Sequence, residues 1–308
     1  MRITILFLSL AALLCAQVPK PAPAKAVKKW RTPWGDPDLQ GTWSNAATTP
    51  LERPAKFGNR EFLTEQERAA EDHETSVGTD KRSDPGSVAD VNAAYNNFWW
   101  ERGWSDGRTS LIYDPPDGRI PPRTIEAQKR ALSVPAENFD GPENQALYTR
   151  CIVRAALPRV PTGYDNNYQI VQSPGMVSIV QEQMHETRVI PLDNTRHLDG
   201  SVRQWLGDSR GHWEGETLVV ESTNFSEQVS FMGATPNMRL IERWTRTADD
   251  RIDYRFTVED PATWTRPWSA AIAWTKTGLL YEYACHEDNY GLYGILSGAR
   301  SEEKRLKR

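Results

Sequence analysis

The sequence is poor in cysteine and has only one long apolar run. Three of its 308 residues are cysteine. One of them, Cys15, ends the apolar run from Ile3, which follows the basic Arg2 and is too short to span a bilayer stably. Because no later run approaches membrane length, we expect a soluble mature protein with no membrane contact.

The sequence also lacks an excess of either charge. Without Arg2, which lies in the segment that we expect to be removed, 36 basic side chains (37 − 1) stand against 41 acidic ones, a formal charge of −5 (36 − 41). The two signs are interspersed and form no basic stripe. We therefore expect no nucleic-acid partner.

Several motifs of common enzyme classes are missing as well. The sequence has no H-E-x-x-H or C-x-x-C spacing for a metal, and no glycine-rich loop before a helix to cradle phosphate. Ser209, between Asp208 and Arg210, is interpreted as a turn residue and not as a nucleophile. Histidines on separate strands would have to converge in space to hold zinc or iron. We expect no metal and no other cofactor.

The first 29 residues are expected to lie outside the folded protein. Residues 1–16 have the order of a signal peptide, with cleavage after Ala16, so the mature protein would be periplasmic or secreted. Lipidation at Cys15 is the alternative, which the bulky Leu14 disfavours. Residues 17–29 are rich in proline, alanine and lysine without periodicity, and predict a disordered linker.

The two remaining cysteines, Cys151 and Cys285, form an even pair in a compartment that permits disulfides. A single bridge would join the middle of the chain to its last expected strand. Two buried free thiols are the alternative, and both stay open because the sequence does not give the Cα separation that a bridge requires.

Residues 30–160 predict an N-terminal arm, short helices and a hairpin packed on a β domain. Proline and glycine interrupt the arm, so only residues 39–44 predict a strand there. Thr64 and Glu67 have the spacing of a capping box and indicate a surface helix within 62–76. The other expected elements are paired strands at 98–100 and 108–113, a helix at 124–132 that begins at Thr124, and a helical turn within 141–148.

Residues 161–300 predict an antiparallel β meander. Runs of β-branched and aromatic residues alternate with short polar turns, among them 248–250 and 277–278. The expected fold is mainly β, a meander that curves into a lipocalin-like barrel, with a long irregular N-terminal segment and a few short helices. Residues 301–308 predict a charged, frayed tail. The expected strands are 168–172, 176–181, 185–192, 217–223, 239–246, 251–258, 268–275 and 279–286.

Alternation within the strands separates a core face from a polar one. Ile252, Tyr254, Phe256 and Val258 share one face of their strand. The tryptophans at 244, 264, 268 and 274 also alternate as core residues do. Glu242 falls on a mostly apolar face, and Glu221 shares a face with an apolar neighbour. Such carboxylates would be desolvated acid–base groups or partners of arginine, and the nearby arginines favour the second interpretation.

Several long motifs resemble a known family. They are W-L-G-D-S-R-G-H-W-E-G-E-T-L-V-V-E-S-T-N-F from Trp205, I-D-Y-R-F-T-V-E-D-P-A-T-W-T-R-P-W from Ile252, Y-E-Y-A-C-H-E-D-N-Y-G from Tyr281 and H-E-T-R-V-I-P-L-D from His185. The chain resembles a family of secreted proteins of environmental bacteria that are described as hypothetical proteins. The resemblance implies an extracytoplasmic compartment and a β architecture, and implies no activity.

The candidate site residues gather around the turn and strand at 209–225. His185, Glu186, His212 and Glu214 are the candidate catalytic residues, because an imidazole beside a carboxylate can act as a general base. The other candidates are polar or aromatic side chains near them in sequence or on an expected strand. These candidate ligand-binding residues are Arg188, Asp208, Trp213, Glu221, Glu242 and His286.

The high aromatic content of the expected barrel favours a binding function. The sequence holds 12 tryptophans and 10 tyrosines, whose flat rings stack on sugars and on aromatic ligands. We expect an extracytoplasmic protein that binds a small organic or carbohydrate ligand in the barrel mouth. The alternative is a secreted hydrolase or lyase that uses a histidine and glutamate pair, with or without a metal. A surface interaction module with a filled barrel is a third hypothesis.

Overall fold

The computed structural model describes residues 30–78, 87, 101, 103–133, 138–287 and 289–307. The expected signal peptide and linker at 1–29 and the expected strand at 98–100 lie outside these residues. The helices are α1 (Glu65–Gly78), α3 (Ile125–Leu132) and α4 (Tyr290–Leu306), with short 3-10 helices η1 (Ala55–Phe57), η2 (Pro142–Asn144) and η3 (Gln183–His185). The strands are β1 (Gly41–Ser44), β2 (Ile112–Asp114), β3 (Asn167–Ser173), β4 (Met176–Gln181), β5 (Thr187–Pro191), β6 (Asp208–Glu214), β7 (Thr217–Thr223), β8 (Arg239–Ala248), β9 (Arg251–Glu259) and β10 (Trp268–Lys276).

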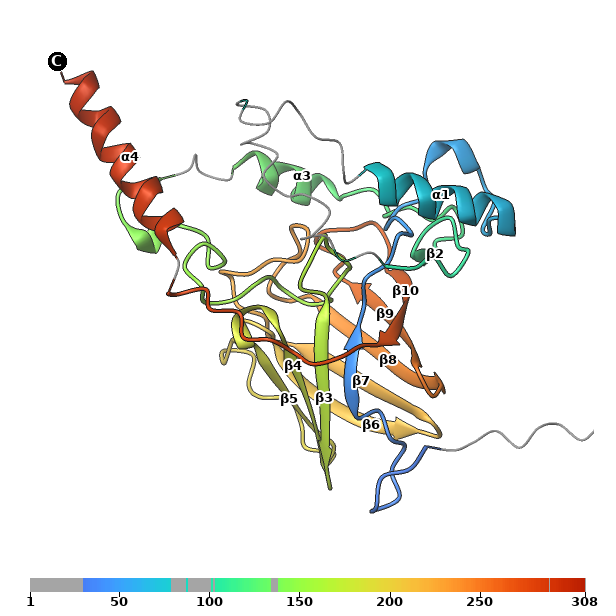
Figure 1. Cartoon of the computed structure of the whole chain (residues 1–308). Helices are drawn as coiled ribbons and strands as arrows, with labels where there is room; N and C mark the ends of the chain where they lie inside the picture. The colour runs from blue at the N-terminus through green and yellow to red at the C-terminus, as the bar shows by residue number, and fades with distance from the viewer. Residues whose placement is uncertain are drawn as a thin grey trace, which may run out of the picture.

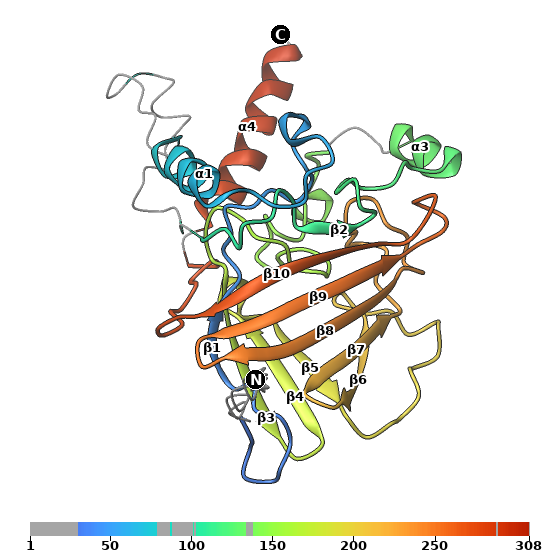
Figure 2. The same ribbon diagram turned by 90° about the vertical axis from the view of Figure 1, so that its right-hand side faces the viewer.

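Nine of these strands form a nearly closed antiparallel barrel, which confirms the predicted fold class. Their order is β5-β4-β3-β1-β10-β9-β8-β7-β6, and β2 pairs with β10 beside this path. Figures 1 and 2 show two curved halves of the sheet, β6 to β10 and β3 to β5, that face each other across the interior. Short turns connect several neighbours, as at Pro174 and Gly175 between β3 and β4, whereas residues 224–238 separate β7 from β8.

The core occupies the inside of the barrel, where alternating residues of each strand point inward. The four residues predicted for the core face of β9 are each at most 1% exposed. Trp244, Trp268 and Trp274 are at most 2% exposed, and Trp264 joins them in the same cluster. Trp43 from β1 is completely buried, and its Nε1 donates to the carbonyl oxygen of Leu39 at 2.9 Å.

The strands β5 and β6 lie at the two ends of the strand order. Within the described residues their backbones do not pair, and contacts between side chains join them. Arg188 in β5 donates from Nε to Ser209 Oγ in β6 (2.9 Å) and from a terminal nitrogen to Ser222 Oγ in β7 (2.6 Å). A Cβ on Gly211 in β6 would lie 2.8 Å from Ile190 Cγ2. The absence of a side chain at Gly211 therefore allows β5 and β6 to pack closely at this junction, which we call the seam.

The prediction of a last strand at 279–286, after a hairpin turn at 277–278, was wrong. Residues 277–284 have no regular structure and 285–287 form a turn. The place beside β10 is taken by β1, whose Trp43 and Ser44 pair with Lys276 and Thr275. Because β1 also pairs with β3, a strand from the predicted arm completes the barrel.

The predicted frayed tail at 301–308 was also wrong, because residues up to Leu306 belong to α4. Asn289 caps this helix by accepting a hydrogen bond from the backbone nitrogen of Leu292 at 3.2 Å. Ion pairs three residues apart, Arg300 with Glu303 and Glu302 with Arg305, lie in its last turns. Figure 1 shows that α4 projects away from the barrel.

The structure confirms both predicted helix starts and contains the disulfide that the sequence left open. Thr64 and Glu67 form the reciprocal capping box before α1, and Thr124 Oγ1 accepts from the backbone nitrogen of Ala127 before α3. Cys151 and Cys285 are bonded, with their Cα atoms 5.8 Å apart. In the part of the chain that the structure describes, no helix is long and apolar enough to cross a membrane.

Candidate functional site

The predicted catalytic residues His212 and Glu214 form a contact on the barrel surface. They lie two residues apart on β6, where His212 Nε2 is 3.2 Å from Glu214 Oε1. Arg243 in β8 donates to the other carboxylate oxygen at 2.6 Å, and this hydrogen bond lowers the pKa of Glu214 below its ordinary value. The two side chains are about half exposed (53% and 49%), whereas Trp213 between them packs against the core. The contact between His212 and Glu214 is therefore a solvated one on the surface.

The predicted catalytic residues His185 and Glu186 both line one outer cleft, but their side chains form no hydrogen bond or ion pair with each other. His185 is exposed at the end of η3, whereas the side chain of Glu186 points inward and is 7% exposed. Glu186 forms a buried ion pair with Arg159 and accepts from the backbone nitrogen of Arg154 at 2.6 Å. Burial raises the pKa of Glu186 above its ordinary value, against the opposing effect of Arg159. His286 is exposed in the 285–287 turn.

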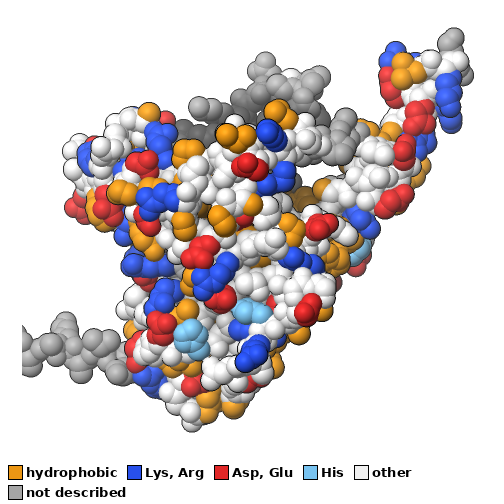
Figure 3. Space-filling view, turned by 180° about the vertical axis from the view of Figure 1, so that it is seen from behind, with side chains coloured by type: hydrophobic (Ala, Val, Ile, Leu, Met, Phe, Trp, Pro, Cys, Tyr) orange, Lys and Arg blue, Asp and Glu red, His pale blue; other side chains and the backbone are white. Residues whose placement is uncertain are grey.

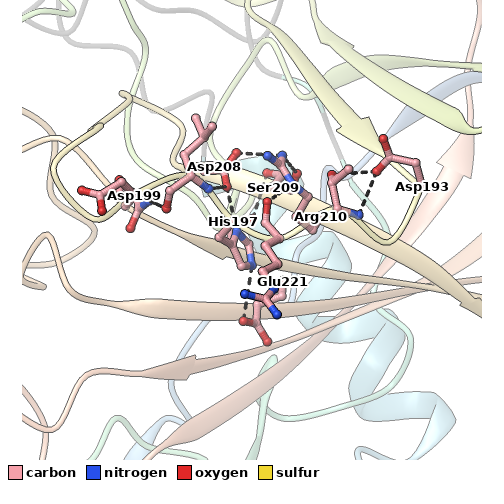
Figure 4. A network of polar contacts seen from close by, with 12 residues as sticks. Asp193, His197, Asp199, Asp208, Ser209, Arg210 and Glu221 are labelled. Carbon is pink, nitrogen blue, oxygen red and sulfur yellow. Dashed lines mark hydrogen bonds and ion pairs between the residues drawn. The ribbon is translucent and has the colours of Figure 1, made fainter.

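Asp208 lies in a polar network whose histidine, His197, was not among the predicted site residues (Figure 4). The Asp208 carboxylate is 4% exposed and lies 2.8 Å from His197 Nδ1, 2.7 Å from an Arg210 nitrogen and 3.0 Å from the backbone nitrogen of Leu198. His197 Nε2 lies 3.4 Å from a Glu221 oxygen. The sequence signal for His197 is weak, since it stands in an irregular segment eleven residues before Asp208.

This network fixes the connection between β5 and β6. Both ring nitrogens of His197 face carboxylates, Asp208 at Nδ1 and Glu221 at Nε2. Glu221 also binds Arg239, and this hydrogen bond lowers the pKa of Glu221 below its ordinary value. In Figure 4, Asp193 and Asp199 lie on the same connection. These contacts hold the connection between β5 and β6 against the barrel, which is a structural role.

The interpretation of Ser209 as a turn residue was wrong, because it lies in β6. The sequence G-D-S-R-G at 207–211 has the G-x-S-x-G spacing of a nucleophile elbow, which the sequence analysis missed. An elbow requires a turn from a strand into a helix and a histidine beside the hydroxyl. Ser209 is instead 3% exposed within a strand, and its Oγ contacts Arg188 and Ser222. It belongs to the buried network that closes the seam.

Arg188 and Glu242 form an ion pair inside the barrel, which confirms the arginine interpretation of Glu242. Their side chains are 6% and 1% exposed. The Tyr254 hydroxyl donates to the second Glu242 oxygen at 2.8 Å, and burial raises the pKa of Tyr254 well above its ordinary value. The Arg188 guanidinium lies 5.8 Å from the ring centre of Trp244. These contacts hold the pair rigidly at the wall of an internal cavity.

That cavity has a volume of about 30 Å³, enough for about two water molecules. Four of its lining side chains are at most 3% exposed and carry polar atoms with no hydrogen-bond partner in the described chain. A buried polar group without a partner costs about 1–3 kcal/mol. Four such side chains around one cavity indicate a polar occupant. They are Tyr168 (Oη), Gln181 (both amide atoms), Trp244 (Nε1) and Trp274 (Nε1).

Two outer clefts adjoin the rim of this cavity. The cleft of about 500 Å³ and the cavity share Arg159, and the cleft of about 450 Å³ and the cavity share Glu186. Arg159 therefore lies between the cavity and the larger cleft, and Glu186 lies, with Arg188 and Leu206, between the cavity and the smaller one. Residues 151–160, which we call the strap, contribute Leu157 and Arg159 to the cavity wall and are anchored by the disulfide at Cys151.

A separate group of three carboxylates, Glu101, Asp165 and Glu182, has oxygens within 4.8 Å of one another. Oxygens of this kind can hold a cation. Here the side chain of Asn167 donates to Glu101 (3.0 Å) and to Glu182 (2.7 Å), and the backbone nitrogen of Tyr281 donates to Glu182 (2.7 Å). Burial, with the charges of Glu101 and Glu182, raises the pKa of Asp165 to about 6.

We expect this carboxyl to make stability fall as the pH rises from about 4 to above 6. The folded pKa of Asp165, about 6, lies above its ordinary value of 3.8, so the native state binds more protons in this window. Asp165→Asn should therefore raise the free energy of unfolding at pH 7.5 by about 1 kcal/mol, since solvent screening reduces the effect at this half-buried group. Urea denaturation across the pH range measures it. At pH 4 the two proteins should agree, and a parallel offset at all pH values would contradict the assignment.

A scan against protein-family models, a search of curated proteins and a search of solved structures each find no match to this chain.

Proposed function

We propose that the protein binds a small organic or carbohydrate ligand inside the barrel. The observation that carries the proposal is the set of four buried side chains with unpartnered polar atoms around one cavity. Buried polar groups pair with the protein or with ordered water, so four side chains without a protein partner around one space favour a site that holds polar molecules. The site lies deeper than the barrel-mouth histidines that the sequence suggested.

We also propose that the protein works outside the cytoplasm. The signal-peptide pattern at 1–16 supports this location, and so does the bond between Cys151 and Cys285, because structural disulfides persist in oxidising compartments. Acidic and basic side chains are interspersed over the face drawn in Figure 3. That distribution gives no support to a nucleic-acid partner.

The alternative of a hydrolase or lyase has less support. His212 and Glu214 are the predicted pair that makes contact, and they line neither the cavity nor the two outer clefts. His197 has carboxylates at both ring nitrogens. The third hypothesis, an interaction module with a filled barrel, requires an interior without the cavity beside Glu242.

A ligand panel tests the proposal. Neutral sugars, phenols and small carbonyl compounds are screened against the mature protein by saturation-transfer NMR. We expect at least one compound to bind the wild type and to lose most of its signal in Gln181→Leu, because that change removes an amide that lines the cavity. Trp268→Phe is the matched control, since Trp268 is equally buried but does not line the cavity. If no compound separates the wild type from Gln181→Leu, the proposal is wrong.

A further inference from the structure

We propose that the ligand is uncharged where it enters the cavity and that it presents oxygen there as a hydrogen-bond acceptor, in a compact group such as a carboxamide or a hydroxyl-bearing carbon. This inference rests on the proposed function above and names the chemistry of the same site. It is argued from the unpartnered atoms, from the charge of the cavity wall and from the cavity's size and shape.

The unpartnered atoms of the cavity wall are mainly hydrogen-bond donors. The indole Nε1 atoms of Trp244 and Trp274 can only donate. The Tyr168 hydroxyl donates and accepts, and its pKa is raised by burial, so it keeps its proton at neutral pH. The Gln181 amide offers two donor hydrogens and one acceptor oxygen. An occupant that satisfies this wall therefore needs more than one acceptor lone pair and at most one or two donor hydrogens.

The charged side chains at the cavity neutralise one another. Arg188 is paired with Glu242, and Arg159 is paired with Glu186, so the wall has two positive and two negative groups. An anionic ligand would be buried without a counter-charge, as would a cationic one, and burying an unpaired charge is costly. A neutral ligand avoids this cost and can still accept hydrogen bonds from the indoles and the phenol.

The aromatic walls and the volume restrict the shape of the ligand. The ring of Tyr168 stacks on Trp274 with 4.6 Å between centroids, and Trp244 stacks on Tyr254 with 4.7 Å. The cavity that these rings line has a volume of about 30 Å³, room for about two water molecules. A compact planar group that takes the place of these two waters must therefore be small. It is either a whole small ligand or the polar head of a ligand whose remainder lies in an outer cleft.

The test compares acetamide with acetate, two probes of nearly the same shape that differ in charge. Indole N–H signals in ¹H–¹⁵N NMR spectra are followed during each titration, and the signals of Trp244 and Trp274 are assigned from the Trp→Phe variants. We expect acetamide to shift both signals saturably and to bind at least tenfold more tightly than acetate. The Trp268 signal should not move, because this indole is buried outside the cavity.

The outcomes separate the ligand chemistry from the binding function. If acetate shifts the two signals as strongly as acetamide, the neutral-ligand inference is overturned while an interior binding site stands. If neither probe moves them and the panel also gives no Gln181-dependent binding, both proposals fail. If neither probe moves them but the panel succeeds, the inference of a compact acceptor group is overturned alone.

Matched variants test the role of the donors. Trp244→Phe and Trp274→Phe each keep an aromatic ring in the stack and remove one N–H donor, so each should weaken acetamide binding by about fivefold. Trp268→Phe makes the same chemical change elsewhere in the core and should leave the affinity unchanged. Circular dichroism and the thermal midpoint confirm that each variant is folded. An equal loss in Trp268→Phe would show that the effect is structural and would overturn the assignment.

Discussion

Glu242→Gln is expected to lower the free energy of unfolding by about 3–5 kcal/mol, the typical cost of removing one partner from a buried ion pair. The side chains of Glu242 and Arg188 are 1% and 6% exposed, so the remaining guanidinium would stay in the barrel without a counter-charge. The change also weakens the acceptor of the Tyr254 hydroxyl. Urea denaturation at pH 7 measures the loss.

Two further variants show whether this loss comes from the unpaired charge. Glu259→Gln removes a carboxylate that binds Arg239 at 2.8 Å on the surface, and it should cost less than about 1 kcal/mol. The double variant Arg188→Met, Glu242→Leu removes both charges and should recover most of the loss, because an apolar pair of similar volume often replaces a buried ion pair without cost. A double variant as unstable as Glu242→Gln would contradict this account.

Removal of the disulfide is expected to have the second largest effect, a loss of about 2–4 kcal/mol. Cys151 and Cys285 are 134 residues apart in sequence, and a chain-entropy argument for so long a loop gives about 5 kcal/mol as an upper value. The variant Cys151→Ala, Cys285→Ala is compared with the wild type by chemical denaturation. Wild-type protein under reducing conditions is the control and should show the same loss.

The disulfide also anchors the strap that walls the cavity, so its removal should act locally. Leu157 and Arg159 lie in the strap a few residues beyond Cys151. We expect amide hydrogens within 152–160 to exchange faster in the double-alanine variant, while those of β8 and β9 change only with global stability. A loss below about 1 kcal/mol, or a uniform change in exchange across the protein, would contradict this role for the bridge.

Local patterns in the sequence were sufficient to predict most of the barrel. Alternation placed Tyr254 and Phe256 on the core face of β9, because successive side chains of a strand point to opposite sides. The same alternation placed Glu242 among apolar neighbours, and the nearby arginines indicated its partner. The capping box at Thr64 and Glu67 predicted the start of α1 because it depends only on residues three apart.

The elements that the sequence did not predict depend on contacts between distant residues or on competing local signals. The place of β1 between β3 and β10 is a pairing across more than a hundred residues, which periodicity does not reveal. Gly291, Gly294 and Gly298 have low helix propensity and, with their aromatic neighbours, masked α4. Its cap at Asn289 was the local signal that could have identified it.

The cavity itself was beyond the reach of the sequence. Tyr168, Gln181 and Trp274 look like ordinary inward-facing strand residues, since a pattern shows which face a side chain occupies and not whether its polar atom finds a partner. His197 was missed for a related reason, because its carboxylate partners Asp208 and Glu221 come from strands that follow it in the chain. Site residues of this kind are identified only when the barrel is assembled.

The measurement that tests the central claim most directly is the electron density inside the barrel of the mature protein, from a high-resolution crystal structure. The account predicts density for water or a ligand within hydrogen-bond distance of the Tyr168 hydroxyl and the Gln181 amide, and its replacement when crystals are grown with acetamide. A closed interior, in which the polar atoms of Tyr168, Gln181, Trp244 and Trp274 bond to one another with no density between them, would contradict it.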